Sequence, residues 1–306
     1  MPCSAVTLSL ATITGIIATA LLAIAFSTDN WLFTEVKRHQ IQQYLTQHPD
    51  SVSIEAFEKK FYYYTRTHGL FRICFPKEKP QIPDVYLSPL ETNCMNIDYF
   101  IPDEENQTRG FSEDAMTRLH MGRSVIALFM VGYLCIFFAF WTGVFGCWRR
   151  SPGNITATAI LMLLACLLCA GGMGLWHGVE YFEKEKMVGE EYYLGWSNVL
   201  KDNSLISYDW SYVVAWVGVG WSLVSAILFS AAAICLRGER MREEAMNMQY
   251  LMPGIPTFFP TYEHALYPQK QQFAYAGYPA AAAYPGPYYH AGAAPAPPPQ
   301  GYGYNY

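Results

Sequence analysis

Four long apolar segments without Asp, Glu, Lys or Arg constrain this chain more than any other feature. They are residues 5–26, 124–148, 155–179 and 212–236. A helix needs about 20 apolar residues to cross the hydrocarbon core of a bilayer, and each segment reaches that length. Soluble helices are rarely apolar all round over such a distance. The sequence therefore predicts a mainly α-helical membrane protein with four transmembrane helices.

The first segment has an alternative interpretation, a cleaved signal peptide with the mature chain starting near Ser27. Against it, no basic region precedes the apolar run, and the run exceeds the usual length of about 7–15 residues. The following "IAFSTDNW" is also a poor match to a cleavage site flanked by small residues. We expect the segment to remain as a membrane span.

Basic residues predict the orientation of the spans. The short connection between the second and third spans carries Arg149 and Arg150 and no acid, and the fourth span ends in "LRGERMR". Positive residues in such short flanks favour the cytoplasm. Both termini are therefore predicted to be cytoplasmic in a multi-pass plasma-membrane protein, with residues 27–123 and 180–211 outside the cell.

The two predicted extracellular segments are acidic. The first has 14 acidic and 11 basic residues, and the second has 7 and 3, so their net charges are −3 and −4. The whole chain carries −5, which leaves +2 for the remainder. The second segment thus presents an acidic surface to solution.

Of the 8 cysteines, two lie in these extracellular segments, Cys74 and Cys94. Disulfides form in this oxidising compartment, so pairing of these two is the expected connectivity. The alternative is two free thiols. A bond would stabilise the fold by roughly 3 kcal/mol through the unfolded chain.

Short motifs in these segments resemble a known family. "DNW" after the first span, "GLFRIC" and the later cysteine resemble the W…GLW…C…C signature of the claudin superfamily. The resemblance is closer to its stargazin branch, the voltage-gated calcium-channel gamma subunits and relatives that regulate glutamate receptors, through "FR", "CMNIDYF" and "YDWSY". The signature positions are Trp31, Gly69, Leu70, Phe71, Arg72, Cys74, Cys94, Ile97, Asp98, Phe100, Tyr208, Trp210 and Ser211.

The resemblance implies a four-helix transmembrane bundle, residues 1–236, under a small extracellular antiparallel β-sheet. The Cys74–Cys94 bond would pin two of its strands. Two departures from the family are visible: Phe71 replaces the signature Trp, and the cysteines are further apart than in typical claudins. The latter puts the junction-forming role in more doubt than the fold.

Composition adds local expectations. Aromatic and β-branched residues in 59–66 and 84–88 favour strands. Small residues allow close helix packing in the membrane, so we expect a Gly171–Gly174 contact face in the third span and another at 218–220.

The spans lack the ionisable side chains that ion pathways and proton relays require. His177, at the outer end of the third span, is interpreted as structural, and Cys166 and Cys169 as small packing residues. The sequence shows no phosphate-binding loop, catalytic triad or metal-ligand cluster. We therefore expect no enzyme, no cofactor, no nucleic-acid partner and no self-contained channel.

Residues 237–306 are predicted to form a cytoplasmic tail. After a helical extension through "RGERMREE", the tail is rich in Tyr, Pro, Ala and Gly, a composition typical of disorder. "PAPPP" resembles a ligand for SH3, WW or EVH1 domains, or for actin-regulatory proteins that contain them. Its prolines are Pro295, Pro297, Pro298 and Pro299. Cys147 and Cys235, at the cytoplasmic boundary, are candidate palmitoylation sites.

Two functions follow as hypotheses. In the first, the protein is a non-catalytic auxiliary subunit that modulates or traffics an ion channel or glutamate receptor, including at a synapse. In the second, it is a claudin-like adhesion protein of cell junctions that couples the membrane to cytoskeletal scaffolds through its tail. The motifs favour the first hypothesis and the tail favours the second.

The predicted topology has a test in glycosylation. "NQT" at Asn106 is an acceptor on the predicted outer side, whereas "NIT" at Asn154 lies on the predicted cytoplasmic side. Enzymatic deglycosylation should reduce the apparent mass of the wild-type protein and of Asn154→Gln on a gel. Asn106→Gln should already run at the reduced mass, and a shift lost in Asn154→Gln instead would contradict the orientation.

Overall fold

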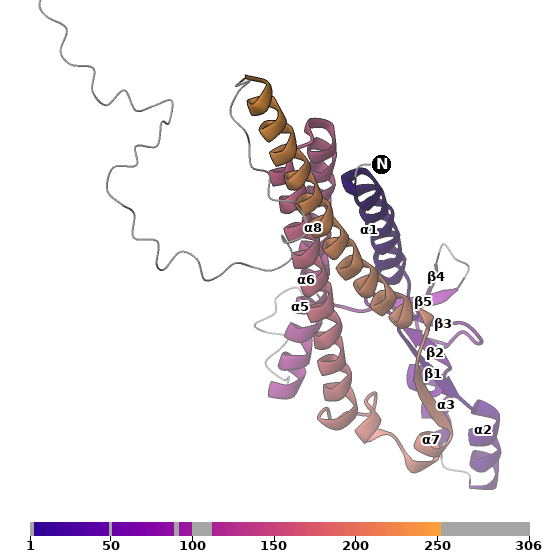
Figure 1. Cartoon of the computed structure of the whole chain (residues 1–306). Coiled ribbons are helices and arrows are strands. Elements are labelled where there is room, and N and C mark those ends of the chain that lie inside the picture. The colour runs from indigo at the N-terminus through magenta and orange to yellow at the C-terminus, as the bar shows by residue number, and fades with distance from the viewer. Residues whose placement is uncertain (1–2, 49–50, 89–91, 100–111, 252–306) are drawn as a thin grey trace, which may run out of the picture. The chain divides into compact units, whose positions relative to one another are not determined.

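The computed structural model describes residues 3–48, 51–88, 92–99 and 112–251 (Figure 1). Several predicted features lie outside these residues: Phe100, the acceptor Asn106 and the tail prolines Pro295, Pro297, Pro298 and Pro299.

Four long helices confirm the predicted spans. They are α1 (Cys3–Ser27), α5 (Glu113–Arg149), α6 (Pro152–Glu185) and α8 (Trp210–Leu251), and each is long and apolar enough to cross a membrane. Local chemistry sets the ends of two of them. The side chain of Ser112 caps α5 by accepting from the Ala115 N–H at 3.2 Å. Arg150 ends that helix in the left-handed conformation, and Pro152 starts α6.

Three of the helices extend beyond their predicted spans. α5 begins within the predicted first extracellular segment, and α6 continues into the second. α8 continues to Leu251, so the expected helical extension through "RGERMREE" is present and runs seven residues further. Arg, Glu, Met and Ala fill this extension, and all four are good helix formers. Hydropathy locates where a helix crosses lipid, but it does not locate where the helix ends.

A six-stranded antiparallel sheet lies at one end of the bundle, in the order β4-β5-β3-β2-β1-β6 (Figure 1). Five strands come from the first predicted extracellular segment, and β6 comes from the second and pairs with β1. The two segments therefore form one sheet. The strands are β1 (Leu32–Val36), β2 (Arg66–His68), β3 (Arg72–Phe75), β4 (Tyr86–Leu87), β5 (Asn93–Asn96) and β6 (Ser204–Tyr208).

The prediction of a strand at 59–66 was wrong for all of these residues except Arg66. A 3₁₀ helix, η1 (Phe61–Tyr63), occupies that segment, and β2 starts only at Arg66. Tyr62, Tyr63 and Tyr64 are all buried, whereas a strand with one solvated face alternates buried and exposed residues. The strand predicted at 84–88 exists, but it is limited to Tyr86–Leu87.

Short helices complete the sheet end of the molecule. The sequence analysis did not anticipate α2 (Arg38–Gln47) and α3 (Ser51–Lys59), nor η3 (Tyr193–Gly195) and α7 (Asn198–Asp202). They enclose a second apolar core, separate from that of the long helices. Its buried members are Val36, Ile41, Phe57, Tyr62, Tyr63, Tyr64, Phe75, Val85, Trp196 and Leu200.

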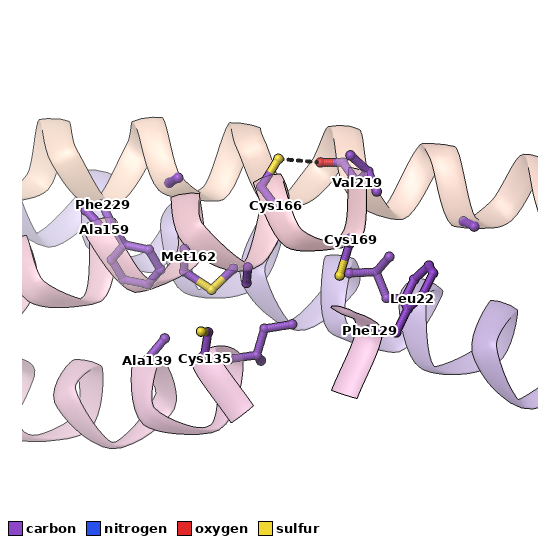
Figure 2. Packing of buried hydrophobic residues seen from close by; sticks show 14 of the residues in the cluster. Leu22, Phe129, Cys135, Ala139, Ala159, Met162, Cys166, Cys169, Val219 and Phe229 are labelled. Carbon is purple, nitrogen blue, oxygen red and sulfur yellow. Dashed lines mark hydrogen bonds between the residues drawn. The ribbon is translucent and has the colours of Figure 1, made fainter. Parts of the chain in front are cut away.

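The core of the bundle combines small and medium side chains with aromatic rings such as Phe129 and Phe229 (Figure 2). Cys166 and Cys169 are buried there, as predicted for packing residues, and the Cys166 thiol donates to the Val219 carbonyl at 3.5 Å. Contacts along the bundle place α1 beside α5 and α8, and α6 beside α5 and α8.

The glycine contact face predicted at Gly171 and Gly174 was wrong. A Cβ at Gly174 would meet nothing within 4 Å, and one at Gly171 would make only an ordinary contact. Gly172, one position along, faces the core instead: a Cβ there would lie 3.0 Å from the Phe129 ring. Composition shows that a span contains small residues, and only the rotation of the helix decides which of them is used.

Gly218 and Gly220 in α8 provide a matched test of close packing. A Cβ at Gly218 would lie 2.9 Å from Leu22 Cγ and 3.1 Å from its backbone nitrogen, whereas one at Gly220 would meet nothing within 4 Å. Gly218→Leu should destabilise the bundle by about 1–3 kcal/mol, as overpacking does. Thermal unfolding in detergent, followed by circular dichroism, should show a lower midpoint for Gly218→Leu and a near wild-type midpoint for Gly220→Leu. Equal midpoints would contradict the α1–α8 contact.

Candidate functional site

Trp31 links the sheet to the helices. Its side chain is fully buried, and its Nε1–H donates to the Ala25 carbonyl at 2.8 Å, close to the end of α1. The indole packs edge-on against Phe129 of α5 and Trp176 of α6, with ring centroids 6.0 and 5.3 Å apart. A single residue thus connects the first strand with three of the spans.

Backbone hydrogen bonds fix the chain on both sides of Trp31. Its N–H donates to the His68 carbonyl of β2 at 3.2 Å, and its carbonyl accepts from the Asp209 N–H at 3.1 Å. Ser211, a signature position at the start of α8, is buried, and its hydroxyl lies 2.8 Å from that of Thr28. The "DNW" and "YDWSY" patches, far apart in the sequence, therefore meet in one joint.

The "GLFRIC" patch packs onto the same joint. The Gly69 N–H donates to the Arg72 carbonyl at 2.8 Å, which forms a tight turn between β2 and β3. A Cβ at Gly69 would lie 2.6 Å from the Cα of Asp29, so a larger residue would push the turn away from α1. Leu70 is buried at this junction.

Arg72 and Asp29 form an ion pair across the joint, with Nη2 2.6 Å from Oδ2 and Nε 3.2 Å from Oδ1. Burial raises the pKa of the Asp29 carboxyl above its ordinary value, and the hydrogen bond and charge of Arg72 act in the opposite direction. The Arg that follows the aromatic residue therefore secures the turn to the segment after α1.

Phe71 occupies the position of the signature Trp. Its ring packs edge-on against Phe26 of α1 with centroids 5.1 Å apart, and 37% of the residue is exposed. Its carbonyl accepts from the Ile97 N–H at 2.8 Å, which connects "CMNIDYF" to the same turn. Asp98 is exposed, and so are Tyr208 and Trp210 to a large degree.

Cys74 and Cys94 form the predicted disulfide. They stand opposite each other on the neighbouring antiparallel strands β3 and β5, and both are buried. The bond fixes the register of these strands below the "GLFRIC" turn.

A buried group of charged residues was missed by the sequence analysis. Arg118 of α5 donates to Glu183 of α6 through Nε at 2.9 Å and through Nη2, and Arg66 and His68 of β2 lie close enough to interact with Glu183 electrostatically. Arg66 donates to the Tyr62 carbonyl at 3.0 Å, and burial lowers its pKa to about 10. These residues are far apart in the sequence and form no motif, so only the fold identifies them.

Burial lowers the pKa of His68 to about 4. The charges of Arg118 and Arg66 lower it further, whereas that of Glu183 acts in the opposite direction. Its Nδ1 has no hydrogen-bond partner among the described residues. His68 is thus held neutral beside the ring of Trp176, with centroids 5.6 Å apart.

His177 belongs to a network of tyrosines at the sheet end of α6. The Tyr212 hydroxyl lies 2.9 Å from its Nε2 and the Tyr208 hydroxyl 3.2 Å from its Nδ1. Tyr208 also donates to Glu180 at 2.5 Å. These contacts explain what His177 does structurally: it connects α6 to β6 and α8.

The two predicted acylation sites differ. Cys147 is free and exposed near the end of α5. Cys235 is disulfide-bonded in this structure, so an acyl chain would require prior reduction of that bond. Palmitoylation at both positions stays a prediction.

The residues described above join the sheet to the helices. Within the described residues, no group of three or more His, Cys, Asp or Glu side chains is placed to hold a metal ion. The predicted signature residues that the structure describes gather where the sheet meets the helices, apart from the exposed Asp98. The joint sets the position of the sheet on the bundle.

One comparison with known proteins identifies a family. The family model described as PMP-22/EMP/MP20/Claudin tight junction matches residues 16–231, which is more than two thirds of the 306 residues. The match covers the helices and the sheet together. No curated protein matches the chain.

Loss of the disulfide should prevent normal delivery of the protein. Cys74→Ser is expected to cost about 2–5 kcal/mol, as for disulfides of small extracellular modules, and to retain the protein in the secretory pathway. Surface biotinylation should detect the loss. The control Cys166→Ser, whose hydroxyl can still donate to Val219, should reach the surface, and normal delivery of Cys74→Ser would contradict the prediction.

His68 should make the stability of the protein sensitive to acid. The pKa of His68 is about 4 in the folded protein and 6.5 for an ordinary histidine in the unfolded chain, so the unfolded chain takes up the proton first as pH falls. Above about pH 6.5 the burial of neutral His68 does not lower the free energy of unfolding. Between pH 6.5 and pH 4 the free energy of unfolding falls with pH, by at most about 1.4 kcal/mol per pH unit.

His68→Phe removes this titration and keeps a ring beside Trp176. Thermal midpoints measured between pH 7 and 5 should therefore fall less for His68→Phe than for the wild type. The exposed His39 provides the control, and His39→Phe should follow the wild type. If the thermal midpoints of all three proteins fell equally with pH, His68 would be excluded as the source of the acid sensitivity.

Proposed function

Because the chain belongs to the PMP-22/EMP/MP20/claudin family, we propose that it is an auxiliary subunit of an ion channel or glutamate receptor. Its helices would lie beside the partner in the plane of the plasma membrane. The sheet and the second extracellular segment would contact the partner outside the membrane. The protein carries out no chemistry in this role, and it changes the gating or surface delivery of the partner.

The acidic second segment is the observation that carries this proposal. Glu185, Glu190, Glu191 and Asp202 are exposed on it. Glu190 lies 3.4 Å from Lys60 but keeps 79% of its side chain exposed, so that pair does little to neutralise it. Complementary charge steers partners and fixes their register, and this surface suits a basic extracellular layer.

The rigid joint supports the same function. β6 follows α7 in the second segment and hydrogen-bonds to β1 along five residue pairs, and β1 leads directly back to Trp31. The acidic surface is therefore held on the same frame as the spans. A partner that binds both in the membrane and above it would meet a fixed arrangement, which lowers the entropy cost of binding.

Charge reversal on this segment tests the proposal. The chain is co-expressed in turn with calcium-channel and glutamate-receptor subunits, and currents and surface levels of each partner are recorded. Glu190→Lys with Glu191→Lys should remove the modulation while leaving the surface level of this chain unchanged. The matched control Glu243→Lys with Glu244→Lys changes the same charge on the cytoplasmic extension of α8 and should modulate normally.

The two outcomes separate clearly. Loss of modulation in the Glu190→Lys, Glu191→Lys variant alone supports the auxiliary role and the binding of the partner to the acidic surface. Unchanged currents and surface levels with wild-type protein, across the partners tested, would exclude the auxiliary role.

A second candidate function, adhesion at cell junctions, is favoured by the outer edge of the sheet. β6 is an edge strand, with Leu205 61% exposed and Tyr208 44% exposed. Edge strands offer unpaired backbone groups to another chain. In this role the tail, which contains "PAPPP", would couple the membrane to scaffold proteins. Concentration of the protein at cell contacts, lost on deletion of residues 252–306, would favour junctions, whereas uniform surface distribution would exclude them.

A further inference from the structure

The bundle is open between α1 and α5, along the part of α5 that ends at Trp148. An apolar groove with a volume of about 850 Å³ lies there, and it reaches core residues of the other two spans. The lining residues on α1 lie between Thr12 and Ala23, those on α5 between Ile136 and Trp148, and the floor is Thr158, Met162 and Phe229.

Small residues contribute to this opening. Gly15, Ala20 and Ala23 line it from α1 and Gly143 lines it from α5, between larger side chains such as Ile16 and Phe140. At the sheet end the same two helices are in contact, because Phe26 packs against Phe129 and Tyr133 with centroids 5.6 and 5.5 Å apart. The opening therefore begins beyond this contact and continues toward Trp148.

The length of the groove selects its occupant. From Ile136 to Cys147 is eleven helical steps, or about 16 Å at 1.5 Å per residue. One leaflet accounts for about half of the 30 Å hydrocarbon core. A transmembrane helix of a partner would need a groove along both leaflets, whereas an acyl chain of one leaflet matches this length.

The charge at the mouth of the groove selects the headgroup. Arg149 and Arg150 follow directly after the lining residues Cys147 and Trp148, and the connection to α6 contains no acid. Both arginines are exposed, and Trp148 is 87% exposed, as expected for an aromatic residue at the interface. Basic residues at this depth attract anionic lipids, which are concentrated in the cytoplasmic leaflet.

We propose that this groove between α1 and α5 binds one acyl chain of an anionic phospholipid, with its headgroup against Arg149 and Arg150. The acyl chain contacts Met162 and Phe229 and so completes the packing of the bundle. Van der Waals packing is a main force between helices in lipid, and an unfilled groove forfeits those contacts. The inference is independent of the proposed function.

Photolabelling tests the site. The purified full-length protein is reconstituted into phosphatidylcholine vesicles that contain a trace of phosphatidylserine or phosphatidylcholine carrying a diazirine in the acyl chain. After irradiation, mass spectrometry maps the adducts. The phosphatidylserine probe should label groove residues on α1 and α5 in preference to lipid-facing residues such as Leu163 and Leu167 of α6, which are 42% and 61% exposed.

Two glycines provide a matched pair of variants. A Cβ at Gly143 would only touch Thr158 at 3.6 Å, so Gly143→Leu fills the groove without a backbone clash. Gly174 of α6 has open space around it and lies away from the groove, so Gly174→Leu is the control. Labelling should fall by roughly tenfold in Gly143→Leu, which corresponds to about 1.4 kcal/mol, and should be unchanged in Gly174→Leu.

A third variant tests the headgroup. Arg149→Gln with Arg150→Asn should reduce phosphatidylserine labelling to the level of phosphatidylcholine, while chain labelling within the groove persists. Asn at position 150 tolerates the left-handed backbone there, where φ is 47°. Thermal midpoints close to wild type show that the variants remain folded.

Four results would overturn the proposal. Even labelling around all lipid-facing positions, or labelling that Gly143→Leu leaves unchanged, means that the groove holds only annular lipid. A hydroxylamine-sensitive acyl mass on Cys147 that blocks groove labelling assigns the groove to a covalently attached chain. Cross-links from the groove to a second copy or to another protein assign it to a helix.

Discussion

The burial of one indole ring at the membrane boundary organises this structure. Trp31 donates to the Ala25 carbonyl of α1 and packs against Phe129 of α5 and Trp176 of α6. This one residue therefore connects the start of β1 with three helices. An indole suits this boundary because its body is apolar and its N–H needs a partner. The backbone on both sides is bonded to β2 and to the segment before α8. The sheet therefore has one defined position on the bundle.

The sheet depends on both predicted extracellular segments and on two kinds of cross-link. β6 arrives from the second loop, and the Cys74–Cys94 bond holds β3 to β5. Where the sheet meets α5 and α6, the Arg118–Glu183 pair lies close to Arg66 and to the neutral His68 of β2. Breaking a largely buried pair of this kind costs more than breaking a surface pair, because one charge is then left alone in a partly desolvated site. The same frame that fixes the fold also fixes the acidic segment proposed to meet a partner.

The two proposed sites lie in different halves of the membrane protein. The acidic segment belongs to the sheet end, whereas the groove between α1 and α5 ends beside Arg149 at the opposite end. The helices touch through Phe26 near the sheet and separate further along, where Gly15 and Gly143 face the gap. An acyl chain in this groove would complete the packing between α1 and α5 where the two helices are apart. It would also make the stability of the bundle depend on membrane composition.

The sequence by itself determined the four spans, the pairing of Cys74 with Cys94 as the expected connectivity, and the family resemblance. An uncharged segment of this length is stable in lipid as a helix, which satisfies its own backbone hydrogen bonds. The signature residues can be recognised because they are adjacent in short patches. Only the tertiary structure decided that Gly172 rather than Gly171 and Gly174 faces the core, that 61–63 forms a 3₁₀ turn, and that α8 ends as late as Leu251. It alone revealed the group around Glu183 and the groove between α1 and α5. Those features depend on helix rotation and on contacts between distant residues, and no local pattern of side chains records either one.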